Sequence, residues 1–188
     1  AMASATTNVV IGSFAGDALT EGSDNVAIGM HVLSAANAGN RSVAIGRSAL
    51  NLQSHGSAAG QNFYNIAIGY NAGAAVTTGT NNTLLGVFAG DGITSGGDNI
   101  AIGQHALSAE TTGKRTTAIG FEALKNQNIG AAGITNSYST VIGYQAGLAI
   151  TEGIVNTLIG ARAGDAMTTG NNNTCLGYQT LSTNVDGD

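Results

Sequence analysis

The sequence predicts an all-β protein: a single-domain parallel β-solenoid of ten coils, with a repeat spacing of 17 or 23 positions. A dipeptide of Ile or Leu followed by Gly recurs ten times, at the short spacing from Gly12 to Gly29 and at the long one from Gly46 to Gly69. A further glycine follows ten positions after each of them. The apolar segments beside these glycines are short, often β-branched and bounded by turn residues, so they cannot be helices. Short strands at a fixed period are typical of stacked coils.

Four coils make one super-repeat, whose period of 74 positions runs, for example, from Gly12 to Gly86. The glycines of the dipeptides are Gly12, Gly29, Gly46, Gly69, Gly86, Gly103, Gly120, Gly143, Gly160 and Gly177. We interpret residues 1–7 as a tag remnant and lead-in, and residues 8–188 as one repeat domain. Its super-repeats are 8–81, 82–155 and, in part, 156–188. No linker or change of composition interrupts the pattern, which indicates a single domain.

Each coil is expected to supply one large apolar side chain to the interior from one of two positions. The first position, four after the dipeptide glycine, is Gly in five coils and Leu in five. Three positions further on, the Gly coils carry Leu19, Val76, Ile93, Ile150 and Met167, whereas the Leu coils carry Leu33, Leu50, Leu107, Leu124 and Leu181 at the first position. Interiors tolerate neither voids nor overpacking. We therefore expect these side chains, with the Ile28-type residues, to form the core.

Asparagine recurs four positions before the dipeptide glycine. Seven coils carry it, as Asn8, Asn25, Asn65, Asn82, Asn99, Asn156 and Asn173. Asn tolerates tight turns, and stacked Asn side chains can form hydrogen-bonded ladders. The column therefore predicts an Asn ladder beside the strands.

The predicted strands are apolar on both faces, which predicts an oligomer interface. Val26 and Ile28 point one way and Ala27 the other, because side chains alternate along a strand. With Ile28 inside, the Ala27 column would face outward, and an aliphatic outward column indicates a covering surface. The predicted interface residues are Ala27, Ala44, Ala67, Leu84, Ala101, Ala118 and Leu158.

The two long coils are candidates for ligand binding. They carry extra segments at 57–64 and 131–138, and both segments end in Tyr. Loops on a rigid rod are where binding functions concentrate, and Tyr with Asn suits glycans or protein surfaces. The predicted ligand-binding residues are Asn62, Phe63, Tyr64, Asn136 and Tyr138. Alternatively, each loop covers a neighbouring chain or fills a gap.

The sequence predicts no enzyme, cofactor or metal site. It contains no Ser/His/Asp or Cys/His set with a base-orienting partner, no phosphate-binding loop and no paired carboxylates. Asp17, Asp24, Asp91, Asp98 and Asp165 are interpreted as turn caps rather than calcium ligands. His31 and His105 are interpreted as an exposed column, and Cys175 as a small hydrophobe.

Composition excludes further classes of partner. The chain has 6 Lys and Arg against 11 Asp and Glu, a net charge of −5, so it offers no basic surface to nucleic acid. Between Arg47 and Asp91 the chain has no Lys, Arg, Asp or Glu. This stretch is rich in Gly, Asn, Gln and Thr, so we expect no membrane insertion. Six coils carry Thr eight positions past the dipeptide glycine: Thr20, Thr77, Thr94, Thr111, Thr151 and Thr168. The residues one position further on are of several types, among them Glu, Ala, His, Ser and Ile. This mixture argues against the flat paired Thr array of an ice-binding solenoid.

The segments NVAIG, SVAIG, NIAIG and NTLIG, each with Gly ten positions on, resemble the head repeats of trimeric autotransporter adhesins. NTLLGVFAGD, NIAIGYNAG and VIGYQAG are similar to repeat runs of phage tail fibres. The resemblance spans residues 8–181 and implies a left-handed β-roll that forms a homotrimer, intertwined or side by side, with the strands near the threefold axis. Heptad stalk, neck motif and membrane anchor are missing, and the coil is longer than the compact autotransporter repeat.

Together these observations predict a non-enzymatic segment of a phage or phage-like tail fibre. It would lie on the virion or extracellular surface and present its loops to a glycan or protein on the host cell. The alternatives are a bacterial trimeric autotransporter adhesin head, a passive structural spacer and an ice-binding solenoid.

Overall fold

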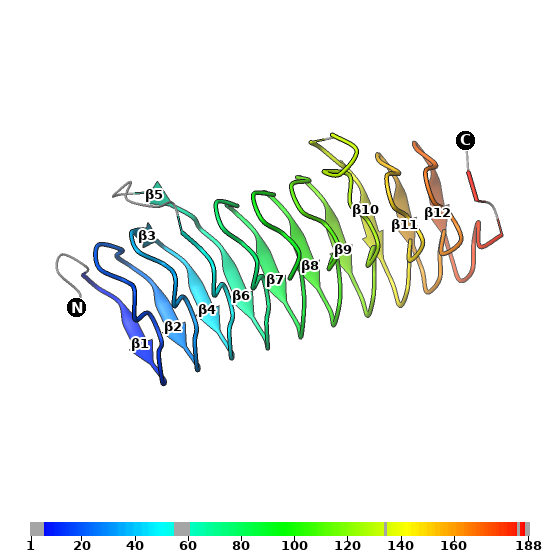
Figure 1. Cartoon of the computed structure of the whole chain (residues 1–188). Coiled ribbons are helices and arrows are strands. Elements are labelled where there is room, and N and C mark those ends of the chain that lie inside the picture. The colour runs from blue at the N-terminus through cyan, green and yellow to red at the C-terminus, as the bar shows by residue number, and fades with distance from the viewer. Residues whose placement is uncertain (1–5, 55–60, 134, 184, 187–188) are drawn as a thin grey trace.

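A computed structural model describes residues 6–54, 61–133, 135–183 and 185–186, and it confirms the predicted all-β parallel solenoid (Figure 1). The described residues form no helix. Each coil contributes one short strand to a ten-stranded parallel sheet. The strands are β1 (Val9–Ile11), β2 (Val26–Ile28), β4 (Val43–Ile45), β6 (Ile66–Ile68), β7 (Thr83–Leu85), β8 (Ile100–Ile102), β9 (Thr117–Ile119), β10 (Thr140–Ile142), β11 (Thr157–Ile159) and β12 (Thr174–Leu176).

The strands are in strict register, so every position of the repeat stacks on its own copy in the next coil. Ala27 of β2, for example, pairs with Val10 on one side and Ala44 on the other. A second, two-stranded parallel sheet, β3 (Gly39–Asn40) and β5 (Gln61–Asn62), lies at the edge from which the first long loop leaves (Figure 1). The bridge between Lys114 and Asn136 is its counterpart one super-repeat later.

Glycine is required where coils contact each other backbone to backbone. Gly86 has a φ of +137°, and a Cβ added there would lie 2.7 Å from the carbonyl oxygen of Gly103. At the other glycine of the same period, a Cβ on Gly79 would lie 2.3 Å from the carbonyl oxygen of Gly96. No side chain fits at either contact, which explains why both glycines recur in every coil.

The core lies inside the coil, and the middle residue of each strand points into it. Ala27 is fully buried, whereas Ile28 is only half-buried. The expectation that the Ile column lies inside and the Ala column outside is therefore wrong. All the predicted interface residues are fully buried within a single chain: Ala27, Ala44, Ala67, Leu84, Ala101, Ala118 and Leu158.

The narrow interior explains why the strands turn the opposite side inward from the one predicted. The strand residue shares this interior with the alternating Gly or Leu position, so both cannot be large in the same place. Leu84 lies between two coils of the Gly class. A Cβ added at Gly73 or Gly90 would lie 2.6 or 2.7 Å from its methyl groups. The inward column is Ala in five of the ten strands, and four of these belong to coils in which a Leu33-type side chain shares the core.

The predicted exchange between two core positions is confirmed. The buried residues of the Gly coils are Leu19, Val76, Ile93, Ile150 and Met167, and those of the Leu coils are Leu33, Leu50, Leu107 and Leu124. Leu181 is partly buried against the same core. Cys175 also packs in this core, as expected for a small hydrophobe.

The Asn ladder is present. The backbone N–H of Asn82 donates to Oδ1 of Asn65 at 2.9 Å, and its side-chain amide donates to the carbonyl of Gly96 at 3.0 Å. Asn25 makes the same two contacts, to Asn8 and to Gly39. Each Asn thus joins its own coil to both neighbours, satisfying polar groups that would otherwise be buried without partners.

The outward side of the ten-stranded sheet is aliphatic in the third residue of every strand, whereas the first residue is Val or Ile in five strands and Thr in the other five. We call the first and third residues of its ten strands the outer sheet face. Its members include Val9, Ile66, Ile68 and Leu176, of which 48%, 39%, 41% and 76% are exposed. In six coils the residue after the dipeptide glycine continues this surface, as Met30, Tyr70, Val87, Phe121, Tyr144 and Tyr178, and in the other four it is Ser13, Arg47, Gln104 or Ala161. A single chain therefore leaves an apolar surface uncovered along its whole length.

Candidate functional site

The structure separates the predicted ligand-binding residues into exposed and buried ones. Tyr64 and Tyr138 are 50% and 57% exposed, and Asn62 and Asn136 are half-buried beside them. Phe63 is fully buried, so its prediction as a ligand contact is wrong. Of the two predicted loop segments, positions 57–60 and 134 lie outside the described residues.

Phe63 is an internal anchor of the first long loop. Its ring fills the space over Gly39, where an added Cβ would lie 2.6 Å from the ring. The equivalent residue one super-repeat later is Ser137, which is buried but small. There the space over Gly113 is filled by Glu110 and Ile129 instead. The two long coils therefore fill equivalent space with different residues.

Glu110 is a fully buried carboxylate held by backbone groups. Its Oε1 accepts hydrogen bonds from the N–H groups of Thr111 at 2.9 Å, Gly113 at 2.8 Å and Gly130 at 3.4 Å. Its Oε2 accepts one from the N–H of Ile129 at 3.1 Å. Because these donors come from two consecutive coils, the carboxylate fastens the base of the second loop to the coil below it.

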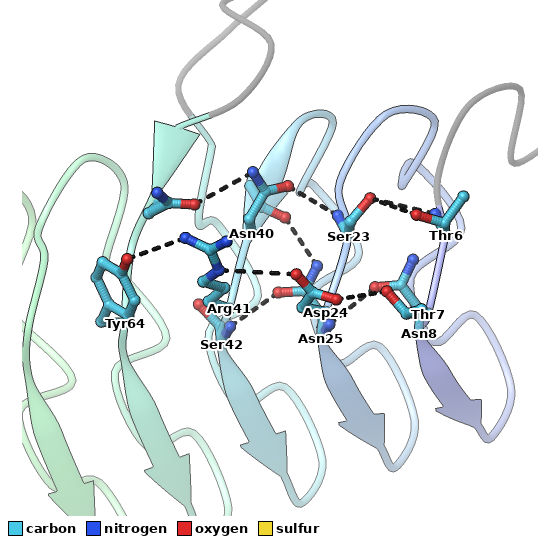
Figure 2. A network of polar contacts seen from close by, with 12 residues as sticks. Thr6, Thr7, Asn8, Ser23, Asp24, Asn25, Asn40, Arg41, Ser42 and Tyr64 are labelled. Atoms are coloured by element: carbon cyan, nitrogen blue, oxygen red, sulfur yellow. Dashed lines mark hydrogen bonds and ion pairs between the residues drawn. The ribbon is translucent and has the colours of Figure 1, made fainter.

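A row of polar side chains runs along the loop edge, one residue per coil, and we call it the polar ladder (Figure 2). Its two copies are Thr7, Asp24, Arg41 and Tyr64, and Asn81, Asp98, Arg115 and Tyr138. All eight residues have left-handed φ values, between 52° and 61°. The side chains therefore leave the coil at the same angle and lie above one another.

Arginine joins the members of each copy. In the first, Nε of Arg41 lies 3.6 Å from Oδ2 of Asp24, and its Nη1 donates to the Tyr64 hydroxyl at 3.0 Å (Figure 2). Thr7 donates to Asp24 from the preceding coil. Tyr64 is thus held through its hydroxyl, and half of the side chain remains exposed.

The second copy repeats this arrangement one super-repeat later. Nε of Arg115 lies 3.9 Å from Oδ2 of Asp98, and its Nη1 donates to the Tyr138 hydroxyl at 2.8 Å. Arg115 also donates to Oδ1 of Asn136 at 3.2 Å, and Asn81 donates to Asp98 at 3.2 Å. The exposed ring of each Tyr therefore has the same polar support.

The polar ladder can recognise a ligand by hydrogen bonds and ring contact, but it offers little net charge. Each Arg is matched by an Asp, and both are about half exposed, so the ion pairs add only about 0–1 kcal/mol of stability. The tyrosines were predictable as exposed loop residues, whereas Asp24 and Asp98 were expected as turn caps and their Arg partners were not expected to take part. The signal was available, because Asp, Arg and Tyr recur at this position with the period of the super-repeat.

The remaining polar candidates lie apart from the polar ladder in the repeat. His31 and His105 stack on Phe14 and Phe88, with ring centroids 4.9 and 5.0 Å apart. Burial raises the pKa of Asp91, whose Oδ1 is buried without a hydrogen-bond partner. Within the described part of the chain, no three His, Cys, Asp or Glu side chains are grouped so that they could hold a metal ion.

The Thr column contributes to the coil rather than to an open surface. The hydroxyls of Thr77 and Thr94 donate to the carbonyls of Thr94 and Thr111 in the following coil, each at 3.1 Å. Thr168 makes the same contact to Val185 at 3.0 Å. These donors are engaged with the protein backbone.

Comparisons of the chain with family models, with curated proteins and with solved structures gave no match. Among the residues that the structure describes, no helix is long and apolar enough to cross a membrane. The function must therefore be argued from the geometry of the solenoid.

Proposed function

We propose that this chain is a segment of a trimeric surface fibre, of a phage or phage-like tail, that attaches to a ligand on the host-cell surface. The observation that carries the proposal is the division of the rod into two unlike surfaces. On the outer sheet face the third residue of all ten strands is Ile or Leu, and the first is Val or Ile in five of them, whereas the polar ladder and the long loops follow a different edge. One surface suits assembly and the other suits recognition.

Assembly through the outer sheet face follows from its continuity. Large contiguous apolar patches on a soluble protein mark interaction surfaces. Ile66 and Ile68 of β6 belong to such a patch, and the same two positions are exposed or half-buried in every other strand. Three copies packed around one axis would cover this face on each of them. The fully buried Ala27 column takes no part in this interface.

The assembly is tested by placing a charge on the outer sheet face. Ile68→Lys should reduce the mass from three times the chain mass of 18.6 kDa to a single chain, because three lysines would be buried without partners. Thr78→Lys, on an exposed edge position, is the matched control. Light scattering coupled to size-exclusion chromatography measures both. A mass that Ile68→Lys leaves unchanged contradicts the interface.

Recognition is tested by removing the polar ladder. Arg41→Ala with Arg115→Ala should weaken attachment of the assembled fibre to host cells at least tenfold, because both tyrosines lose their hydrogen-bonded support. Arg162→Ala, an exposed arginine outside both the polar ladder and the outer sheet face, is the control. Attachment that survives both the double Arg→Ala change and deletion of 57–64 and 131–138, with no ligand bound by the purified protein on a glycan array, would indicate a passive spacer. Attachment only as part of a bacterial surface protein would favour the adhesin-head alternative.

A further inference from the structure

A surface hollow of about 560 Å³ lies in the coils that follow the second long loop. It is lined by Glu152, Ile154, Val155, Thr169, Asn171 and Asn172. Val155 is the next residue after Tyr138 in the column of the polar ladder, and its N–H donates to the carbonyl of Ser137 at 2.7 Å. The volume falls within the range of small-molecule sites.

The lining combines an apolar part with unengaged polar groups. Ile154 and Val155 supply the apolar part, and 41% of Val155 is exposed. The side chains of Glu152, Thr169 and Asn172 make no hydrogen bond to the part of the chain that the structure describes. The residues that line the hollow thus include one with a carboxylate, one with a hydroxyl and one with an amide that are free of hydrogen bonds within the described chain.

Hydrogen bonds within the chain hold one wall of the hollow in place without a ligand. Oδ1 of Asn171 accepts a hydrogen bond from the N–H of Ile154 at 2.8 Å, and the N–H of Asn172 donates to the Ile154 carbonyl at 3.2 Å. The lining residues of the two coils are therefore held in register. Preorganisation of this kind lowers the entropic cost of binding.

The charge of the lining selects the class of ligand. Glu152 is its one charged residue, and neither Lys nor Arg is present. Arg115, two coils away in the polar ladder, is already paired with Asp98. Sulfated, phosphorylated and sialylated ligands would therefore meet a carboxylate without a compensating cation. A neutral pyranose instead offers an apolar ring face for the aliphatic residues and hydroxyls for the carboxylate and amide.

At the same place in the preceding super-repeat, the two residues of the polar ladder are paired and no carboxylate stands at the position of Glu152. The equivalent residues are Thr78, Thr80, Asn81, Ser95, Gly97 and Asp98. Asn81 and Asp98 are hydrogen-bonded to each other, and Asp98 also pairs with Arg115. The third copy carries Val155 and Asn172 at these two positions, and the side-chain amide of Asn172 has no such partner.

We propose that this hollow binds a neutral saccharide, such as a terminal hexose or N-acetylhexosamine. The inference rests on the proposed function, because it names the ligand class and the place of attachment. The second copy of the polar ladder and the second long loop then lie on one side of the bound sugar, with Tyr138 one coil away from it.

The test uses the assembled protein on an array of neutral N-acetylglucosamine and galactose oligomers and of sialylated oligomers of the same length. We expect binding to the neutral probes alone. Glu152→Ala with Thr169→Ala should weaken it at least tenfold. The matched control, Thr78→Ala with Ser95→Ala, changes the equivalent positions one super-repeat earlier and should leave affinity unchanged.

Several outcomes would overturn the proposal. One is binding to sialylated probes only, and another is neutral binding that the hollow variant leaves intact. A third is attachment of the fibre to host cells with no saccharide bound on the array. In these three cases the proposed function can still stand. Loss of the proposed function itself would show as a fibre that attaches to no host cell, before any hollow variant is made.

Discussion

At the scale of single residues, burial decides what each polar group does. Glu110 and Glu152 have the same side chain, but one is enclosed by backbone donors and the other faces solvent. Tyr64 and Phe63 are neighbours, yet one belongs to the polar ladder and the other to the interior. Both residues were predicted as ligand contacts, because the sequence does not indicate which residue of the loop enters the core. The positive φ at Tyr64, which turns its side chain outward, is not visible in the sequence.

Replacement of Glu110 tests the buried carboxylate. Glu110→Ala should lower the free energy of unfolding by about 3 kcal/mol, because it leaves buried backbone N–H groups without an acceptor. Thermal unfolding followed by circular dichroism measures the change. Glu152→Ala, at an exposed position, is the control and should unfold like the unchanged protein. Equal melting of all three proteins would mean that water replaces the carboxylate.

The raised pKa of Asp91 predicts a pH dependence of stability. Burial raises this pKa above its value in the unfolded chain, so the folded state holds its proton to higher pH. Stability from this group is present at low pH and is lost as pH rises through the folded-state pKa. Asp91→Asn should remove that loss, so its melting temperature should exceed that of the unchanged protein increasingly as pH rises to neutral. Asp17→Asn, at the exposed equivalent position, should show no such divergence, and parallel profiles for Asp91→Asn would contradict the prediction.

At the scale of the coil, the stacking of the strands was predictable from the sequence. The side of each strand that points into the core was not. Period, glycine positions and the exchange between two core positions together defined the stacked coils. The error concerned which side of a strand such as Val26-Ala27-Ile28 faces inward, since both sides are apolar. The covariation between the middle residue of the strand and the Gly or Leu position would have decided which side faces inward. Val10, Leu84, Val141 and Leu158 are the large residues of the inward strand column, and each belongs to a coil of the Gly class.

This covariation predicts how a coil can be converted from one class to the other. Gly90→Leu alone should destabilise the fold by about 1–3 kcal/mol, because the new side chain overlaps Leu84 and Ile93. Adding Leu84→Ala and Ile93→Ala reproduces the combination seen in the coil of Ala27, Leu33 and Ala36, and should recover part of the loss. Melting temperatures of the single and triple variants measure this. A triple variant less stable than the single one would contradict the exchange.

At the scale of the whole molecule, register is the property that must be conserved. Each strand pairs with its copy in the adjacent coils, and the long loops occur once in four coils. Parallel pairing and stacking were therefore predictable from the spacing alone. The polar ladder was only half predictable, because its Asp–Arg–Tyr contacts join coils that are stacked in space but stand a full repeat apart in the chain.

Deletion of a complete super-repeat should preserve the fold. Removal of residues 82–155 joins two coils at equivalent positions, so strand pairing, the Asn ladder and both glycine contacts continue across the junction. Removal of 82–151 stops short of the super-repeat boundary and misaligns all of them. We expect a cooperative melting transition and a β-type circular dichroism spectrum for the first deletion only. A folded second deletion would show that register is less strict than the glycine contacts require.

The super-repeat also gives the fibre a scale of length. Four coils at the usual spacing of strands amount to about 19 Å. Tyr64 and Tyr138, which lie four coils apart, are therefore held about 19 Å apart along a rigid rod. Receptors that are spaced on a surface by multiples of this pitch could be engaged together and held by avidity, whereas irregular receptors would be met one at a time. Selection among host surfaces could thus depend on the spacing of receptors as well as on their chemistry.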